Sequence, residues 1–252
     1  MKQNFQIEKV LKTTKNLKVY LIKKDEKLFV LKTVTSFDAK TITMLKNEVK
    51  NLILLENFNI VPKVIEYNFD DENNYAILEY IEGNPIDKIK GFSFDEKLDS
   101  IFKVLDVIKK IHEMGIVHCD LKPSHIILTK NNDIKIIDFG ISSYKDENLL
   151  RGYGNIQYCS LEQLFHENVT FSTDIYALGI IIYELLIGEN IFGTEKEEIK
   201  KNKINSNYKR CDIPVLNMIM INILEANNNM KYKNIDELEN ALKILLEIGG
   251  DL

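Results

Sequence analysis

The chain has 252 residues, of which 28% are charged and 45% hydrophobic, and its formal net charge is −5. This length can hold one large or two small domains with a substantial core. Because the net charge is mildly negative and the lysines are scattered among acidic residues, the composition argues against a general basic surface for nucleic acid.

The sequence favours a reducing, cytoplasmic setting. The N-terminus has no apolar core of a signal peptide, and the longest apolar run, residues 177 to 187, is interrupted by Glu184 and too short to cross a bilayer. We therefore expect a cytoplasmic protein without a membrane partner. Abundant isoleucine, lysine and asparagine indicate an AT-rich genome, such as that of a bacterium. The cysteines are widely spaced without a C-x-x-C pair, which argues against disulfides and zinc: Cys119, Cys159 and Cys211.

Residues 5 to 34 predict paired strands. Two apolar runs, 19–22 and 28–31, are joined by a charged turn at 23–27, which is typical of a hairpin. Lys32 ends the second run. A lysine at the end of a buried strand can direct its ammonium group into a cleft, where phosphate groups could pair with it.

Residues 42 to 58 predict an amphipathic helix, because apolar side chains recur there at helical spacing. Two further strands are predicted at 61–67 and 75–81, separated by an acidic turn at 70–74. The first third of the chain is therefore expected to be a small sheet with one helix.

The remainder is predicted to be mostly helical. Residues 95 to 114 form a long amphipathic pattern that Gly115 ends. Asp174 lies at the start of an apolar helix, where a buried acid can cap that helix and accept N–H groups from a neighbouring loop. The last predicted helices are 214–225 and 235–246.

Residues 118 to 128 bring together a carboxylate, an ammonium group and an imidazole: Asp120, Lys122 and His125. Apolar runs at 126–128 and 134–137 follow, and the second ends at Asp138. Two short buried strands, each beside a lone acid, indicate a site built on a rigid hairpin. In the alternative interpretation, both acids are turn residues that cap strand ends.

The D-L-K-P run at 120–123 and the D-F-G run at 138–140 resemble the catalytic loop and metal-binding segment of Hanks-type Ser/Thr protein kinases. The resemblance implies an α+β, bilobal protein-kinase fold as a single domain over residues 1–252. It implies a small, mostly antiparallel β N-lobe with one helix in 1–81 and a larger α-helical C-lobe in 82–252.

The same resemblance implies an ATP site between the lobes. Lys32 would reach the α- and β-phosphates, held by an ion pair with Glu48; alternatively, Glu48 is a surface acid paired with a neighbouring lysine. Val19 would cover the adenine, and the backbone of Glu79 and Ile81 would hydrogen-bond it. The residues implied to bind the nucleotide are Lys32, Glu48, Val19, Val30, Glu79, Ile81 and Ile127.

For phosphate transfer to a protein hydroxyl, the resemblance implies Asp120 as base and Lys122 as the cation that balances charge on the γ-phosphate. Asp138 would hold Mg²⁺. His125 occupies the position of a metal-binding asparagine, and because imidazole is a softer ligand than an amide oxygen, Mn²⁺ is the alternative to Mg²⁺. His125 could instead contact phosphate directly, or mark a weak kinase or a pseudokinase.

Three further positions depart from the kinase pattern. The glycine-rich loop is degenerate, since Lys12, Thr14 and Leu17 replace its glycines and remove the close backbone approach to phosphate. Cys119 replaces an arginine that pairs with a phosphorylated segment, so we expect activity that does not depend on such phosphorylation. Glu162, which ends a stretch resembling the substrate platform, has Lys231 as its nearest candidate partner.

Three functions therefore follow from the sequence. The first is an ATP-dependent protein Ser/Thr kinase, and the second is a pseudokinase that acts as a nucleotide-binding or scaffolding module. The third is a small-molecule phosphotransferase, against which Lys122, the stretch ending in Glu162 and the Asp174 helix argue.

Overall fold

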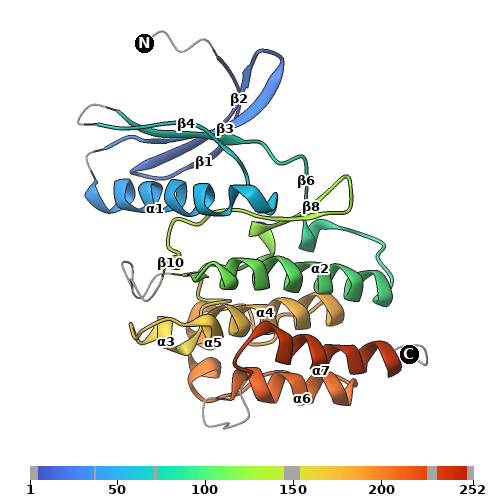
Figure 1. The fold of residues 1–252 in the computed structure, drawn as a ribbon. Helices are drawn as coiled ribbons and strands as arrows, with labels where there is room; N and C mark the ends of the chain where they lie inside the picture. The colour runs from blue at the N-terminus through green and yellow to red at the C-terminus, as the bar shows by residue number, and fades with distance from the viewer. Residues whose placement is uncertain (1–4, 37, 71–72, 145–153, 226–231, 249–252) are drawn as a thin grey trace.

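The computed structural model describes residues 5–36, 38–70, 73–144, 154–225 and 232–248. It consists of two parts: a twisted sheet with one helix, and a helical part below it (Figure 1). A small sheet of β6 (Gly83–Pro85), β8 (Ile126–Thr129) and β9 (Ile134–Ile136) lies between them.

The larger sheet has five strands in the order β1-β2-β3-β5-β4, and every neighbouring pair is antiparallel. Its two-residue turn at Asp25 and Glu26 has φ values of 49° and 61°, as a tight hairpin of this twist requires. The predicted hairpin is thus confirmed, with strands that extend into the charged turn. The strands are β1 (Gln6–Thr13), β2 (Leu17–Lys24), β3 (Lys27–Val34), β4 (Val64–Phe69) and β5 (Asn74–Glu79).

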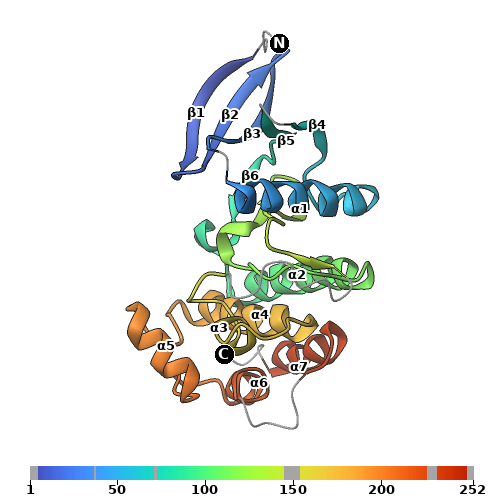
Figure 2. The same ribbon diagram turned by 90° about the vertical axis from the view of Figure 1, so that its left-hand side faces the viewer.

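Helix α1 (Ala39–Leu55) packs beneath this sheet (Figure 2). Asp38 caps it by accepting a hydrogen bond of 3.0 Å from the backbone N–H of Thr41. Its apolar face, which includes Leu45 and Leu52, is buried. The last turn predicted for this helix is instead the 3-10 helix η1 (Glu56–Phe58).

The helical part is built around α4 (Phe171–Ile187), which is buried on most sides. This burial explains the long apolar run in the sequence, because a helix that is apolar all round belongs in a core. Among the described residues, no helix combines the length and apolarity needed to cross a membrane. The other helices of this part are α2 (Phe94–Glu113), α3 (Leu161–Leu164), α5 (Lys196–Ile204), α6 (Pro214–Leu224) and α7 (Ile235–Ile248). Helices α2 and α6 pack against α4, and α7 packs against α2 and α6.

The predicted long helices are therefore confirmed, with α2 fixed at its start by a reciprocal cap between Ser93 and Glu96. The sequence did not predict α5 or the shortest elements, because one or two turns carry too little periodicity. These short elements are β6, η2 (Ile86–Lys88), β7 (Ile116–Val117), η3 (Pro123–His125) and β10 (Ser143–Tyr144).

One hydrophobic core extends from α1 through the β8–β9 hairpin into α2 and α4. The backbone N–H of Ile136 also donates to the carbonyl of Ile60, 2.9 Å away, which ties β9 to the chain that follows α1. The two parts are thus held in contact by packing as well as by covalent connection.

Candidate active site

The β8–β9 hairpin brings two acidic side chains together. Asp120 precedes η3 and β8, and Asp138 follows β9. The backbone N–H of Ile137 donates to the carbonyl of His125 at 3.0 Å, so the two ends of the hairpin are joined. Asp138 has a φ of 70°, a left-handed conformation that a residue other than glycine adopts when its surroundings impose it, often at functional sites.

Lys32 on β3 and Glu48 on α1 form the ion pair expected from the sequence. The Lys32 Nζ donates to both oxygens of Glu48, at 2.6 and 2.8 Å, and lies 3.3 Å from Oδ1 of Asp138. The exposed fractions of the Lys32 and Glu48 side chains are 13% and 4%. Glu48 is therefore a buried partner of Lys32 rather than a surface acid.

The pKa values in this group follow from mutual compensation of charges. Burial disfavours the charged form of Lys32, but Asp138 and Glu48 together raise its pKa above the usual value. The Lys32 ammonium lowers the pKa of Asp138. Burial raises the pKa of Glu48, and the attraction to Lys32 opposes that rise. Asp138 is thus held as a carboxylate.

His125 joins the two acidic residues. Its Nδ1 lies 2.9 Å from the carbonyl oxygen of Asp120, and its Nε2 lies 3.3 Å from Oδ2 of Asp138. Because a carbonyl oxygen only accepts, Nδ1 carries the hydrogen. Burial lowers the pKa of His125 to about 4, although both aspartates oppose this. The neutral ring therefore presents a lone pair at Nε2 towards the Asp138 carboxylate.

Lys122 completes the cluster, with its Nζ 2.9 Å from Oδ2 of Asp120. We call Lys32, Glu48, Asp120, Lys122, His125 and Asp138 the cleft cluster. Three carboxylates there face two ammonium groups, so the cluster has an excess of one negative charge.

The cleft cluster fits a divalent cation. One ligand atom from each of Asp120, His125 and Asp138 lies within 4.8 Å of the others. A cation would balance the negative excess and separate the His125 lone pair from the facing carboxylate. Two oxygen donors and one nitrogen donor suit Mn²⁺ at least as well as Mg²⁺, which prefers oxygen alone.

A second buried acid, Asp174 on α4, fixes the loop that carries Asp120. It accepts hydrogen bonds from the backbone N–H groups of His118 and Cys119, at 2.8 and 2.9 Å. His112 Nε2 on α2 donates to it at 2.8 Å. Burial acts to raise the pKa of Asp174, but these donors, His112 above all, hold it below the usual value. The predicted role of Asp174 as an acceptor for the loop is confirmed, but the prediction that it caps α4 is wrong, because the N-cap residue is Thr170. No sequence pattern indicated His112.

Three of the residues expected to bind a nucleotide are apolar and lie on strands. Val19 on β2 is the cross-strand neighbour of Lys32, and Val30 on β3 pairs with Leu78. Ile127 is buried on β8 and pairs with Pro85 of β6. Each of these three apolar residues is thus held by its strand.

The chain after β5 was expected to supply backbone hydrogen bonds. The N–H of Glu79 already donates to the carbonyl of Lys63 at 2.8 Å, so only the carbonyl of Glu79 is left for an adenine. Ile81 lies beyond the end of β5, and no other described residue bonds its backbone N–H. Glu79 and Ile81 therefore offer one acceptor and one donor.

The turn between β1 and β2 closes without glycine. The Thr14 N–H donates to the carbonyl of Leu17 at 2.8 Å, and the Leu17 N–H donates to the Thr14 hydroxyl at 3.0 Å. These two backbone N–H groups are therefore already hydrogen-bonded within the turn. Because they cannot also donate to phosphate, the expected loss of close backbone contact with phosphate follows from these two bonds as well as from the missing glycines.

Two side chains hold the segment resembling a substrate platform in ways the sequence did not indicate. Gln163 Nε2 donates to the carbonyl of Cys119 at 2.7 Å, and the Tyr158 hydroxyl donates to Glu184 at 2.8 Å. Glu162 accepts weak hydrogen bonds from two hydroxyl groups on α4, both at 3.4 Å. Its expected partner, Lys231, lies outside the described residues.

Similarity to known proteins is consistent across sequence and structure. The family model described as protein kinase domain matches residues 9–248. A probable serine/threonine-protein kinase of Clostridium acetobutylicum is 28% identical over 228 residues, covering 84% of this chain and 35% of that protein. A probable cAMP-dependent protein kinase catalytic subunit of Encephalitozoon cuniculi is 30% identical over 190 residues, covering 73% and 59%.

The solved structure of the Cydia pomonella granulovirus kinase PK-1 has a TM-score of 0.77, with 24% identity and coverage of 93% of this chain and 92% of that one. This likeness concerns the fold, and it confirms the predicted α+β, bilobal architecture. The chain spans 35% and 33% of the length of its relatives in Clostridium acetobutylicum and Clostridium perfringens.

Proposed function

Since the chain belongs to the protein kinase family, we propose that it transfers the γ-phosphate of ATP to serine or threonine hydroxyls of proteins. The supporting observation is the cleft cluster, in which Lys32, Glu48 and Asp138 meet within hydrogen-bond distance beside the Asp120–Lys122 pair. We also assign residues 1–81 and 82–252 to the two lobes of one domain.

In this proposal the apolar side chains around the cleft enclose the adenine. Val19 and Val30 lie above it, and Ile127 lies below it. The carbonyl of Glu79 accepts from the base, and the N–H of Ile81 donates to it. Lys32, kept extended by Glu48, reaches the α- and β-phosphates and supplies positive charge.

Asp120 orients the acceptor hydroxyl and takes its proton as the bond to phosphorus forms. Lys122, already paired with Asp120 at 2.9 Å, is placed to follow negative charge onto the transferred phosphate. Asp138 and His125 would hold the divalent cation, which neutralises phosphate charge when bound. In this proposal, the partners of the site are ATP and a protein substrate. The absence of nucleic-acid and membrane partners stays a prediction, and so does the cytoplasmic location.

The preference for one divalent metal over another should depend on whether position 125 carries histidine or the usual asparagine. We propose retained activity with a shifted preference towards Mn²⁺, because an imidazole nitrogen is a poorer ligand for Mg²⁺ than an amide oxygen is. A His125→Asn variant should recover a preference for Mg²⁺ in a titration of activity against each metal. The same Mg²⁺ optimum in both proteins would contradict this assignment.

A pseudokinase is the second candidate. It is favoured by the β1–β2 turn, whose amides at Thr14 and Leu17 bond within the turn instead of facing phosphate. A small-molecule phosphotransferase is the third. Phosphorylation of a peptide mixture but not of small alcohols would separate the first proposal from the third.

The deciding experiment is transfer of labelled phosphate from γ-labelled ATP to a generic basic protein, with Mg²⁺ and with Mn²⁺. Asp120→Asn should lower the rate by about 10²- to 10⁴-fold. Asp133→Asn is the matched control, because Asp133 is an exposed acid on the same hairpin and should leave the rate unchanged. If ATP binds but no label appears with either metal, the pseudokinase is the correct function.

A further inference from the structure

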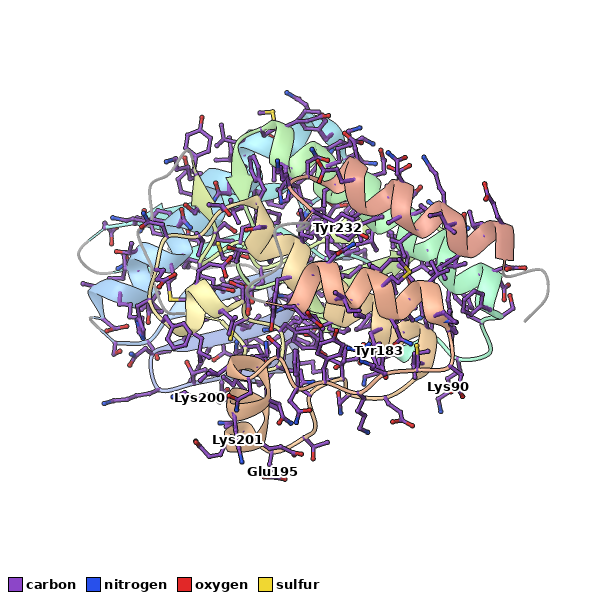
Figure 3. The ribbon with its side chains drawn as sticks, turned by 90° about the horizontal axis from the view of Figure 1, so that it is seen from below. Lys90, Tyr183, Glu195, Lys200, Lys201 and Tyr232 are labelled. Atoms are coloured by element: carbon purple, nitrogen blue, oxygen red, sulfur yellow. The ribbon has the colours of Figure 1, made fainter. Side chains whose placement is uncertain are left out.

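Helix α5 buries a lysine. Lys203 has an exposed fraction of 0%, whereas its neighbours Lys200 and Lys201 are exposed on the outer side of the same helix (Figure 3). Lysine is among the residues least often buried completely, and it is then usually paired with an acid. Lys203 therefore needs a physical explanation.

The contacts of Lys203 are unusual for a cation. Its Nζ donates to the carbonyl oxygen of Cys159 at 2.6 Å and lies 4.9 and 5.3 Å from the ring centroids of Tyr176 and Phe192. Within the described part of the chain, no carboxylate lies close enough to form an ion pair with it. Burial lowers the pKa of Lys203 to about 8, while Cys159 and Glu184 act in the opposite direction.

Stability alone does not explain this arrangement. A buried charge without an ionic partner is unfavourable, and an apolar side chain of similar volume is often at least as stable in such a place. Such a side chain lacks an N–H group, however, and would leave the carbonyl of Cys159 without its donor. The specific contribution of Lys203 is therefore to hold that carbonyl.

Cys159 lies in a short segment, residues 154–160, beside Asp120. Residues from the segment and from the loop line one small cavity: Cys119, Asp120, Asn155, Tyr158 and Cys159. Inside the segment, the backbone N–H groups of Tyr158 and Cys159 both donate to the carbonyl of Asn155, at 2.9 and 2.8 Å. A polypeptide whose hydroxyl reaches Asp120 must lie against this surface.

The segment is held from two sides. Gln163 accepts from the backbone N–H of Ser160 at 3.2 Å and donates to the carbonyl of Cys119, next to Asp120. Lys203 connects the segment to α5, which is otherwise attached mainly by the buried Ile199 and by a hydrogen bond from Asn202 to the carbonyl of Phe192. A change at Lys203 should thus alter the segment without touching the cleft cluster.

We propose that Lys203 is a positioning residue for the protein substrate: it fixes the backbone at Cys159, and through it residues 154–160, against the side of Asp120. This inference rests on the proposed kinase function. It assigns a role to a residue that contacts neither ATP nor the acceptor hydroxyl.

The test compares Lys203→Met with Lys201→Met, which removes an exposed lysine from the same helix. In Lys203→Met, the KM for a generic basic protein should rise about tenfold, as expected for one lost hydrogen bond to a charged donor. The kcat and the KM for ATP should stay unchanged, because the cleft cluster is intact. Lys201→Met should match the wild-type protein in all three constants.

Hydrogen exchange gives a measurement that does not depend on activity. Exchange of the Tyr158 and Cys159 amides should become about tenfold faster in Lys203→Met, with no change in α4 and none in Lys201→Met. If Lys203→Met does not fold, Lys203→Gln, whose amide is one bond too short to reach Cys159, should show the same pattern.

Unchanged exchange at these two amides would overturn the inference, as would a loss of kcat with an unchanged KM for the protein substrate. A wild-type protein that transfers no phosphate would overturn the proposed function instead. The two failures are thus distinguishable.

Discussion

The cleft cluster and the Asp174 site each bury carboxylate groups, but they balance charge in opposite ways. At Asp174, one carboxylate with an exposed side-chain fraction of 1% receives three hydrogen bonds, two from backbone N–H groups and one from the His112 ring. In the cleft cluster, three carboxylates face two ammonium groups, and the Asp138 side chain keeps an exposed fraction of 32%. Hydrogen-bond donors therefore enclose the Asp174 carboxylate, whereas the cleft cluster keeps an excess of one negative charge.

Under the proposed function, this difference separates a structural acid, Asp174, from a functional one, Asp138. The buried Asp174 carboxylate already accepts three hydrogen bonds, so it is suited to fixing the loop that carries Asp120. The negative excess of the cleft cluster has some cost in stability, and a bound cation would remove that cost. Mutations should therefore affect activity at one site and stability at the other.

Among the changes that test this comparison, the largest effect is expected at Asp138. Asp138→Asn should lower phosphate transfer by about 10³-fold, because it removes a cation ligand at the phosphates. The thermal midpoint should not fall, since the substitution also removes the negative excess. Activity and thermal unfolding of the same preparation check this, with Asp133→Asn as control. A clear loss of stability would show that Asp138 resembles Asp174 after all.

Asp174→Ala should show the reverse pattern. It leaves the His112 side chain and the N–H groups of His118 and Cys119 buried without an acceptor, which should lower the free energy of unfolding by about 3 kcal/mol. Urea unfolding measures this loss. Loss of activity at full stability would contradict the comparison.

A smaller effect is expected from the pH dependence of stability at Lys203. Its ordinary pKa is 10.5 and its folded value is about 8, so between these values the unfolded chain binds more protons than the folded protein does. Stability should therefore rise with pH across this window, by at most about 1.4 kcal/mol per pH unit for one proton.

Lys203→Met should lack this contribution, so the difference between the pH profiles of the two proteins reports the titration of Lys203 together with its coupling to Cys159 and Glu184. Urea unfolding at several pH values provides the measurement. Parallel pH profiles would show that Lys203 is not a buried, uncompensated cation. The lysines of the cleft cluster differ from it because carboxylates compensate their charge.

The smallest effect is expected from dephosphorylation. Cys119 stands where a phosphate-binding arginine would be needed, and its backbone N–H is already bonded to Asp174. Treatment with a phosphatase should therefore leave the kinetics of phosphate transfer unchanged. A collapse of activity after treatment would mean that another group binds a regulatory phosphate.

Local sequence patterns were sufficient to locate the long elements and the main acids of the candidate site. Helices such as α2 and the β2–β3 hairpin follow from periodicity that extends over many residues. Asp120, Lys122 and Asp138 could be identified because each lies in a short run with fixed spacing. The position of Glu48 on a helix followed in the same way, and its ion pair with Lys32 forms as expected.

The partners that compensate the buried charges could be found only in the folded protein. His112 and Asp174 are 62 residues apart in the chain, and Lys203 and Cys159 are 44 apart, so no local pattern links either pair. A lysine in a sequence is most often a solvated residue, and only the packing of α5 against Tyr176 and Phe192 makes Lys203 an exception. Periodicity reports which face of an element is buried, but the partner of a buried charge depends on which distant segments the fold brings within a few ångströms of it.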